Sequence, residues 1–361
     1  MARKANIGKA RAAQANGRRA REVVTVNDVA RHAGVSPMTV SRVVNGEKYV
    51  REETRNTVLA SVRALNYSPN QAARSLAGAQ GLRIALLYGN PSASYLGEFL
   101  LGALDESGRK SAQLILEKCD VESEKGERNA VRNLVKSGVD GVILPPPLCE
   151  VASIRAALKE NDVAAVAVAP GRPLTDCSCV RIDDYRAAYE MTSYLLAQGH
   201  RRIAFIKGHP NQTASAERLH GFTEAMADAK HPVDKALIVQ GYFTYVSGLE
   251  AGERLLALKR RPTAIFASND DMAAGAVSAA HKRGLDVPRD ISIVGFDDTS
   301  ILAAVWPPLT TIRQPVAQMA ELAVNILAAE IRVRKRKGVA DAVDRVVPHS
   351  LVLRESVAPA S

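Results

Sequence analysis

Polar side chains recur at the ends of apolar runs in the second part of this 361-residue sequence. They are Asn90, Tyr95, Gln212, Arg218, Asn269, Asp297 and Gln314, and Phe243 in GYFTYVSG is an additional aromatic candidate. Amide, carboxylate and guanidinium groups can each make paired hydrogen bonds to adjacent hydroxyl groups, and an aromatic ring can pack on the C–H face of a sugar. These residue types predict binding of a small polar ligand, with no cofactor.

A second group of candidates lies in two short helical patterns near the start of the chain. TVNDVARHAG begins with Thr25, carries Asp28 three residues later in a variant of the capping box, and ends at Gly34. SPMTVSRVVNG follows, with Ser36 as its N-cap and Pro37 at the first helical position. Two short helices joined by HAGV are typical of a helix-turn-helix, in which the start of the second helix enters the major groove of DNA.

The second of these helices carries the groups that would contact DNA. Pro37 and Met38 are predicted to face base edges, and Arg42 lies near enough to reach the O6 and N7 atoms of a guanine. Hydroxyl and amide groups suited to phosphates come from Thr39, Ser41 and Asn45. A helical hairpin that serves only the protein's own packing is the alternative, but it leaves the exposed Pro-Met pair and the local basic charge unexplained.

The positive charge of the chain is concentrated near its N-terminus. The first 80 residues contain 14 Lys and Arg residues against five Asp and Glu residues, whereas the whole chain has a net charge of +10. Residues 1–22 contain seven of these cations and no hydrophobic periodicity, so we predict a disordered basic arm there. A basic head on a nearly neutral body indicates an anionic partner for the head.

Composition and motifs disfavour several other classes of protein. No apolar run approaches the roughly 20 residues that span a bilayer, and the first 22 residues lack the apolar segment of a secretory signal, which predicts a soluble cytoplasmic protein. Four cysteines in so long a chain do not form a disulfide framework, and the spacing of Cys177 and Cys179 does not suit zinc. No P-loop, HExxH, GxSxG or GxGxxG motif stands at a strand-to-helix turn, so we predict neither catalysis nor a metal.

Three helical patterns precede residue 68, and their apolar positions predict a miniature core. These positions are Val26, Val29, Ala30, Val35, Val40, Val43, Val44, Val58, Leu59, Val62 and Leu65. The following stretch, SPNQAARSLAGAQG, has a proline, a short segment that can form a helix, and a glycine-rich exit. We interpret it as a hinge or linker.

From residue 82 onward, β-rich apolar runs alternate with amphipathic helices. This alternation is typical of parallel sheets that are covered on both faces. The runs are RIALLYG, AQLILEKC, GVDGVILPP, AAVAVAP, CVRID, RRIAFIKG, KALIVQG, PTAIFASN and DISIVGFD, and Gln314 ends a later crossover strand. So many strands exceed one typical sheet and predict two doubly wound lobes, whose ligands bind beyond the carboxyl ends of the strands.

The first 80 residues resemble the DNA-binding head and hinge of the LacI/GalR family of transcriptional repressors. The similarity rests on VTVNDVARHAGVSPMTVSRVVNG and NQAARSLAG, and it continues in order through GHRRIAFIKG, ERLHGF, AIFASNDDMAAGA, DISIVGFDDT and PPLTTIRQP. It implies a homodimer whose paired heads bind a pseudo-palindromic double-stranded DNA operator. It also implies that the hinge forms a helix on DNA, where Leu76 wedges into a minor-groove step. The predicted DNA contacts are Thr25, Ser36, Pro37, Met38, Thr39, Ser41, Arg42, Asn45, Tyr49, Asn70, Ala73 and Leu76.

The resemblance also implies an α/β fold in which a small all-α helix-turn-helix head and a hinge helix join a two-lobed, doubly wound body like that of periplasmic binding proteins. The expected domains are a basic arm at 1–22, a DNA-binding domain at 23–68, a hinge and linker at 69–81, and an effector-binding and dimerisation domain at 82–361. We expect lobe 1 to contain about 82–182 and 315–343, and lobe 2 about 183–314 and 344–355. The resemblance assigns effector contacts to Arg218, Phe243, Asn269, Asp297 and Gln314.

The nature of the effector stays open at the level of sequence. We expect a small carbohydrate, with a purine-like corepressor as the alternative within the same class and a plain sugar-binding receptor as the alternative outside it. Many members of the family carry an aspartate after the fourth strand of lobe 1, where this chain has Ala169-Pro170-Gly171. The hydroxyl contact made there in relatives is therefore missing or moved. No zipper-like leucine heptad follows LVLRESVAPAS, so we expect a dimer rather than a tetramer.

Several further residues receive structural interpretations. Asp270 and Asp298 are expected to be helix caps or turn formers, and His200 is expected to be structural. The basic run at 332–338 is expected to be a solvated loop, with a second nucleic-acid patch as the alternative. Trp306 is assigned to either the pocket rim or the core, and Pro145-Pro146-Pro147 to either a pocket wall or a stiff loop. Arg51 replaces the usual small capping residue at the start of the third helix.

Overall fold

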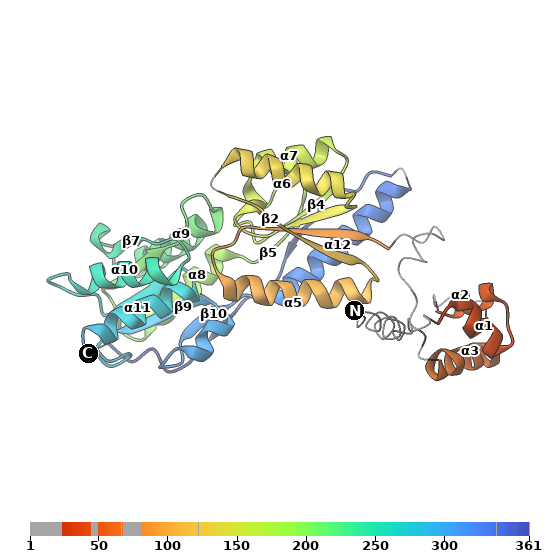
Figure 1. Cartoon of the computed structure of the whole chain (residues 1–361). Coiled ribbons are helices and arrows are strands. Elements are labelled where there is room, and N and C mark those ends of the chain that lie inside the picture. The colour runs from red at the N-terminus through yellow and green to blue at the C-terminus, as the bar shows by residue number, and fades with distance from the viewer. Residues whose placement is uncertain are drawn as a thin grey trace, which may run out of the picture. The chain divides into compact units, whose positions relative to one another are not determined.

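The computed structural model describes residues 24–44, 50–65, 67, 81–121, 123–336 and 338–360. Two compact units make up the chain, residues 1–81 and residues 82–361 (Figure 1). The predicted basic arm and nearly all of the predicted hinge lie outside the described residues. Within the described ranges, no helix has both the length and the apolar character needed to cross a membrane.

The first unit contains three short helices, α1 (Val26–Ala33), α2 (Pro37–Val44) and α3 (Glu52–Ala64). The expected capping box is present at the start of α1, where the Thr25 side chain accepts from the Asp28 N–H and the Asp28 carboxylate accepts from the Thr25 N–H. Gly34 ends α1 with a left-handed backbone, φ 66°, which glycine adopts at little cost. These local signals fix the turn between α1 and α2.

The miniature core of this unit contains Val29, Ala30, Val40, Val43 and Val58, and the other expected apolar positions pack around it with one exception. That exception is Leu59, whose side chain is 38% exposed and was wrongly assigned to the core. Ser61 is buried instead, because its hydroxyl lies 3.0 Å from Nδ1 of His32 and also donates to a backbone carbonyl. Arg51 precedes α3 without a capping bond from its side chain.

The second unit begins with a six-stranded sheet, which forms lobe 1. The strand order is β11-β5-β4-β3-β1-β2, and all five pairs are parallel. These strands are β1 (Arg83–Tyr88), β2 (Gln113–Lys118), β3 (Gly141–Leu144), β4 (Ala164–Val168), β5 (Ser178–Arg181) and β11 (Asp344–Val346). The central strands β3 and β4 are buried along their whole length because helices cover both faces of the sheet.

Helices pack on the two faces of this sheet in pairs. One pair is α5 (Ala93–Arg109) and α12 (Val316–Lys335), and the other is α6 (Glu124–Ser137) and α7 (Ala152–Glu160), which follows the short η1 (Leu148–Glu150). Figure 1 shows α6 and α7 above the sheet and α5 below it. Gly102 lets α5 approach α12 closely, since a Cβ at this position would lie 2.8 Å from Cα of Ala317.

A second six-stranded sheet forms lobe 2. Its order is β12-β10-β9-β8-β6-β7, and only the edge strand β12 is antiparallel to its neighbour. The strands are β6 (Ile203–Lys207), β7 (Ile238–Gln240), β8 (Ala264–Ala267), β9 (Ser292–Asp297), β10 (Thr310–Arg313) and β12 (Ser350–Val352). The topology therefore repeats that of lobe 1 except at this edge.

Lobe 2 is also covered on both faces. Its helices are α8 (Asp184–Ala197), α9 (Thr213–Asp228), α10 (Tyr245–Leu256) and α11 (Asp270–Lys282), with the short turns η2 (Lys235–Leu237) and η3 (Ser300–Ala304). On the face of α8 and α9, the Phe205 ring stacks on Phe222 at 4.8 Å and meets Phe266 edge-on at 5.1 Å. This core continues into the α5 and α12 face of lobe 1, so one apolar cluster spans both lobes.

The chain crosses between the lobes after β5, after β10 and after β11. We expected the second segment of lobe 1 to end at residue 343, but the last crossing comes later in the chain, because residues 344–346 pair with β5 in lobe 1. Arg181 on β5 explains this pairing, since its guanidinium group donates to both oxygens of Asp344 at 2.8 Å. The expected loop at 332–338 is also partly wrong, because α12 continues to Lys335.

Candidate functional site

The exposed start of α2 is the candidate nucleic-acid interface of the first unit. Val40 and Val43 face the core, whereas Pro37, Met38 and Arg42 face outward, with Met38 65% exposed. A large exposed apolar side chain at the first turn of a helix is not explained by packing within the unit. Its position next to an exposed arginine suits contact with base edges.

Three of the predicted DNA contacts also stabilise the helix starts that present them. The Ser36 hydroxyl accepts from the Thr39 N–H at 3.2 Å and lies 2.9 Å from the Thr39 hydroxyl. Thr25 is exposed and takes part in the capping box of α1, where hydrogen bonds from Thr25 lower the pKa of Asp28. Ser41 is exposed on α2. The remaining predicted contacts lie outside the described residues and are Asn45, Tyr49, Asn70, Ala73 and Leu76.

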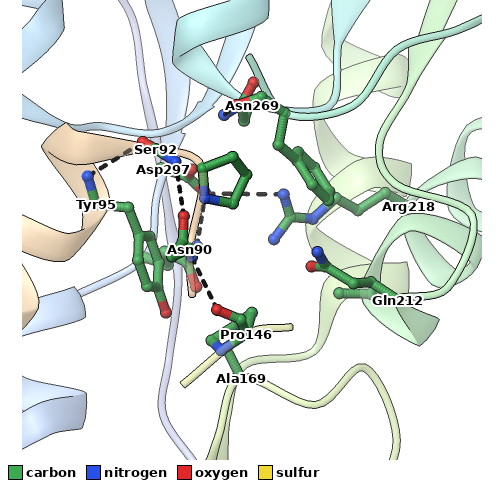
Figure 2. A pocket seen from close by; sticks show the side chains of 13 residues that line it. Asn90, Ser92, Tyr95, Pro146, Ala169, Gln212, Arg218, Asn269 and Asp297 are labelled. Atoms are coloured by element: carbon green, nitrogen blue, oxygen red, sulfur yellow. Dashed lines mark hydrogen bonds and ion pairs between the residues drawn. The ribbon is translucent and has the colours of Figure 1, made fainter. Parts of the chain in front are cut away.

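A pocket between the two lobes is the candidate ligand site of the second unit (Figure 2). Its walls surround about 410 Å³ of space, part of it open to solvent. All eight residues that the sequence placed in the effector site line it, namely Asn90, Tyr95, Gln212, Arg218, Phe243, Asn269, Asp297 and Gln314. Pro146 and Ala169 also line it, so the proline run contributes a wall. Sequence reasoning did not anticipate Pro91, Ser92 and Ala214.

The fold brings these residues together because most of them follow the carboxyl ends of parallel strands. In lobe 1 they follow β1, β3 and β4 or lie in the first turn of α5. In lobe 2 they lie just before α9 or in its first two turns, just before α10 and α11, and at the ends of β9 and β10. The Asn90 amide ties two of these loops together by donating to the Pro146 carbonyl at 3.1 Å.

Arg218 is the cation of the pocket, and its position is fixed by several partners although it is only 5% exposed. Its Nε donates to Asp184 Oδ1 at 2.7 Å, and its Nη1 donates to the Ser268 carbonyl at 2.6 Å. The guanidinium carbon also lies 3.6 Å from the centre of the Phe296 ring. A buried arginine held in this way presents its charge to the pocket in one orientation.

Asp297 lies beside Arg218 in the pocket, with Oδ1 3.7 Å from Nη1. Burial raises the pKa of Asp297 to about 7, against the opposing effects of the Arg218 charge and of a hydrogen bond from Gln314. That bond runs from Nε2 of Gln314 to Oδ1 of Asp297 at 2.5 Å. A carboxyl group with this pKa is only partly ionised at neutral pH.

Two buried polar atoms at this site have no hydrogen-bond partner among the described residues. They are the hydroxyl oxygen of Tyr95 and Oε1 of Gln314. Burial also raises the pKa of Tyr95 well above its usual value, so the phenol stays protonated. Because unsatisfied buried polar atoms are costly, a donor for Gln314 and a polar partner for Tyr95 are what a bound ligand would supply.

Phe243 and Asn269 complete the part of the pocket wall that lobe 2 supplies. Phe243 has a left-handed backbone, φ 60°, and its ring lies 5.8 Å from the guanidinium carbon of Arg218. Asn269 caps α11 by accepting from the Met272 N–H at 3.0 Å, and its amide donates to the Phe243 carbonyl at 3.2 Å. Asn269 therefore holds the pocket together as well as lining it.

Asp270 and Asp298 were expected to be helix caps or turn formers, and both have structural roles. Asp270 is not the cap of α11; its buried carboxylate instead accepts from the Thr299 N–H at 2.8 Å and from the Thr311 hydroxyl at 2.7 Å. Asp298 forms the turn after β9, with φ 61°, and accepts from two arginines. Both hold the strand ends in place rather than facing the ligand site.

The other candidates lie away from the pocket. His200 is buried and bonded through both ring nitrogens, to Thr263 and to the Ala358 carbonyl, as expected of a structural histidine. Trp306 is 71% exposed and lines neither the pocket nor the core. Burial raises the pKa values of all four cysteine thiols, and the described residues contain no group of three or more metal-ligating side chains.

Comparisons with known proteins match both units. A family model for bacterial regulatory proteins of the lacI family matches residues 25–70, and a model for a periplasmic binding protein-like domain matches residues 192–357. The chain is 34% identical to the HTH-type transcriptional repressor PurR of Actinobacillus pleuropneumoniae, over 93% of this chain and 98% of the relative.

Two solved structures are similar over nearly the same length. The transcriptional regulator CelR in complex with cellobiose has a TM-score of 0.70 and 30% identity, and the match covers 92% of this chain and 99% of CelR. The lac repressor dimer bound to operator and the anti-inducer ONPF has a TM-score of 0.71 and 28% identity, with 93% and 99% covered. The similarity therefore includes the head as well as the two lobes.

Proposed function

The chain belongs to the lacI family of bacterial regulatory proteins and is a DNA-binding transcriptional regulator, and we propose that it is a homodimeric repressor controlled by a small carbohydrate. Members of this family are not enzymes, as the sequence predicted. The observation that carries the proposal is the pocket between the lobes, where a charged pair and two unsatisfied polar atoms surround one space.

A sugar fits the chemistry of this space. Each hydroxyl group of a sugar both donates and accepts, so adjacent hydroxyls can donate to Gln314 Oε1 and Asp297 while accepting from Tyr95 and Arg218. Phe243 supplies an apolar face for the C–H groups of the ring. The cellobiose in the similar CelR complex supports the same class of ligand.

A purine-like corepressor is the second candidate. It is favoured by the Phe243 ring, which can stack on a planar base, and by Gln314, whose amide group can pair with the edge of a base. The two candidates differ in shape, because a purine is flat whereas a sugar places hydroxyl groups above and below its mean plane. Direct binding measurements therefore separate them.

DNA reading is assigned to the start of α2. We place Pro37 and Met38 against base edges and Arg42 on a guanine, with Thr25, Ser36, Thr39 and Ser41 near the phosphates. The boundaries proposed for this function are 23–68 for the head and 69–81 for the hinge. Two heads bind one pseudo-palindrome, because the symmetry of a dimer is matched by that of its operator.

An exposed apolar surface on lobe 1 supports the homodimer. Leu101 and Leu104 on α5 are 64% and 53% exposed, and Leu116 on the adjacent edge strand β2 is 51% exposed. Large apolar side chains gathered on one exposed surface are typical of protein–protein interfaces. A second copy of the chain would cover this surface and the free edge of β2.

The effector is tested by thermal-shift and calorimetric screening of the purified chain against monosaccharides, disaccharides and purine bases. We expect at least one sugar to bind and to change affinity for DNA recovered by selection from a randomised pool. Linkage requires that this DNA change the sugar affinity by the same factor, typically 5- to 150-fold. Binding of purines alone would replace the carbohydrate by the second candidate, and binding of neither would overturn the ligand-controlled switch.

A further inference from the structure

A carboxylate outside the pocket lining joins the two lobes beside it. Glu150, the last residue of η1 in lobe 1, accepts from the N–H of Thr213 in lobe 2 at 2.8 Å through Oε2. Its Oε1 accepts from the Thr213 hydroxyl and from the Gly171 N–H, the latter at 3.2 Å. Three donors, two of them from the opposite lobe, therefore converge on one carboxylate.

These contacts make Glu150 a helix cap supplied from the other lobe. Gln212 occupies the N-cap position of α9 with an extended backbone, but its side chain makes no capping bond. The Glu150 carboxylate takes that role, and the positive end of the helix dipole stabilises a negative charge there. α9 carries Ala214 and Arg218 of the pocket, so Glu150 fixes the helix that presents the pocket cation.

The backbones of the two lobes also touch at this place. A Cβ on Gly171 would lie 2.5 Å from the carbonyl carbon of Thr213 and 2.6 Å from Cα of Ala214. The Gly171 N–H donates to the Thr213 hydroxyl at 2.9 Å, and Arg172 pairs with Glu217 on α9 at 2.6 Å. Only a residue without a side chain permits this approach.

The opposite flank of the pocket has its own inter-lobe bonds. Glu98 on α5 accepts from the Ser300 N–H at 2.9 Å, and the Ser92 hydroxyl donates to Asp271 at 2.6 Å. These bonds involve other elements than Glu150 does. A change in these bonds therefore indicates a change in lobe closure and not a local effect at Glu150.

We propose that Glu150 is an inter-lobe latch, a positioning residue that holds the lobes closed around the pocket before any ligand binds. Opening the lobes would strip the carboxylate of both Thr213 donors and of the helix end. Hydrogen bonds to a charged group give a net stabilisation over the bonds to water that replace them on opening, so the latch favours the closed arrangement. Its effect on effector affinity rests on the proposed function, whereas its effect on lobe closure does not.

The test is amide hydrogen exchange of the full chain without DNA or ligand, in the wild type, Glu150→Ala and Gly171→Ala. The first substitution removes the latch, and the second inserts a wedge at the same seam while keeping the Glu150 side chain. Both should speed exchange of the Ser300 amide on the opposite flank by about 10-fold or more, a scale set by the loss of charged hydrogen bonds. The radius of gyration from small-angle scattering should rise as well.

Two control variants match these changes. Glu124→Ala removes an exposed glutamate from the first turn of α6, and Gly97→Ala adds a Cβ where no atom lies within 4 Å. Both should leave Ser300 exchange unchanged. If Glu150→Ala fails to fold, Glu150→Gln keeps the shape of the side chain and loses its charge. Faster exchange at Thr213 with no change at Ser300 would mean that Glu150 is only a local cap, and the latch would be rejected.

Discussion

Replacing Asp297 by Asn should change how the stability of the body depends on pH. The wild-type carboxyl group has a pKa of about 7 in the folded chain, because burial disfavours its charge. Its pKa in the unfolded chain is about 3.9. Asparagine has nearly the same shape and resembles the protonated acid, so the substitution removes the titration and keeps most of the packing.

Because folding raises the pKa of Asp297, this group makes the folded chain less stable as pH rises. The folded chain binds the Asp297 proton more tightly than the unfolded chain, so the stabilising contribution is fully present below about pH 3.9 and is lost as pH rises through about 7. Between pH 5 and pH 8 the free energy of unfolding of the wild type should therefore fall by about 2–3 kcal/mol relative to that of Asp297→Asn, on the scale of 1.36 kcal/mol per pH unit.

Urea unfolding of both proteins at pH 5, 6, 7 and 8 measures this difference. Asp184 and Asp270 also have raised pKa values, and the charge of Asp297 is itself one cause of the raised pKa of Asp270, so the measured difference includes this coupling. The control is Asp105→Asn on the exposed side of α5, which should follow the wild type. A constant difference between the wild type and Asp297→Asn at all four pH values would show that Asp297 does not titrate near neutral pH.

Three further predictions concern DNA and assembly. Arg42→Ala should weaken binding to selected operator DNA by about 1–3 kcal/mol and relax one base pair per half-site, measured by fluorescence anisotropy on single-base variants; equal loss on random DNA would assign Arg42 to phosphate. Deleting residues 2–20 should weaken binding to all DNA alike and flatten its salt dependence, and an unchanged slope would mean that the arm does not touch DNA. The double variant Leu101→Glu, Leu104→Glu should sediment as a monomer, whereas a dimer at micromolar concentration would place the interface elsewhere.

The strands and the pocket residues could be predicted because both follow from local patterns. Nine apolar runs marked the nine strands from β1 to β9. In a doubly wound fold the carboxyl ends of parallel strands lie at one edge of each sheet, so polar residues after those runs had to lie near each other. Arg218, Asp297 and Gln314 come from distant parts of the chain, yet all three line one pocket.

The features that sequence did not reveal depend on contacts between distant segments. β11 and β12 are short strands at sheet edges, and β11 is defined by its pairing with β5, which the ion pair between Arg181 and Asp344 supports. Ala214 has no polar group to suggest a site and lines the pocket only because of where α9 begins. Glu150 follows a cysteine in an unremarkable short turn, and its role depends on Thr213 in the other lobe.

The latch and the pocket together constrain how an effector can act. A ligand shifts an equilibrium between two lobe arrangements only by the difference in its affinity for them. If Glu150 already holds the lobes closed, a ligand that binds the closed arrangement gains affinity, because it does not have to close the lobes itself. Binding of the same ligand then causes a smaller change in the arrangement of the lobes. A large change in DNA affinity must come instead from a shift within the closed body, and Asp297, which bonds Gln314 at the end of β10 just before the crossing into α12, is placed to transmit one.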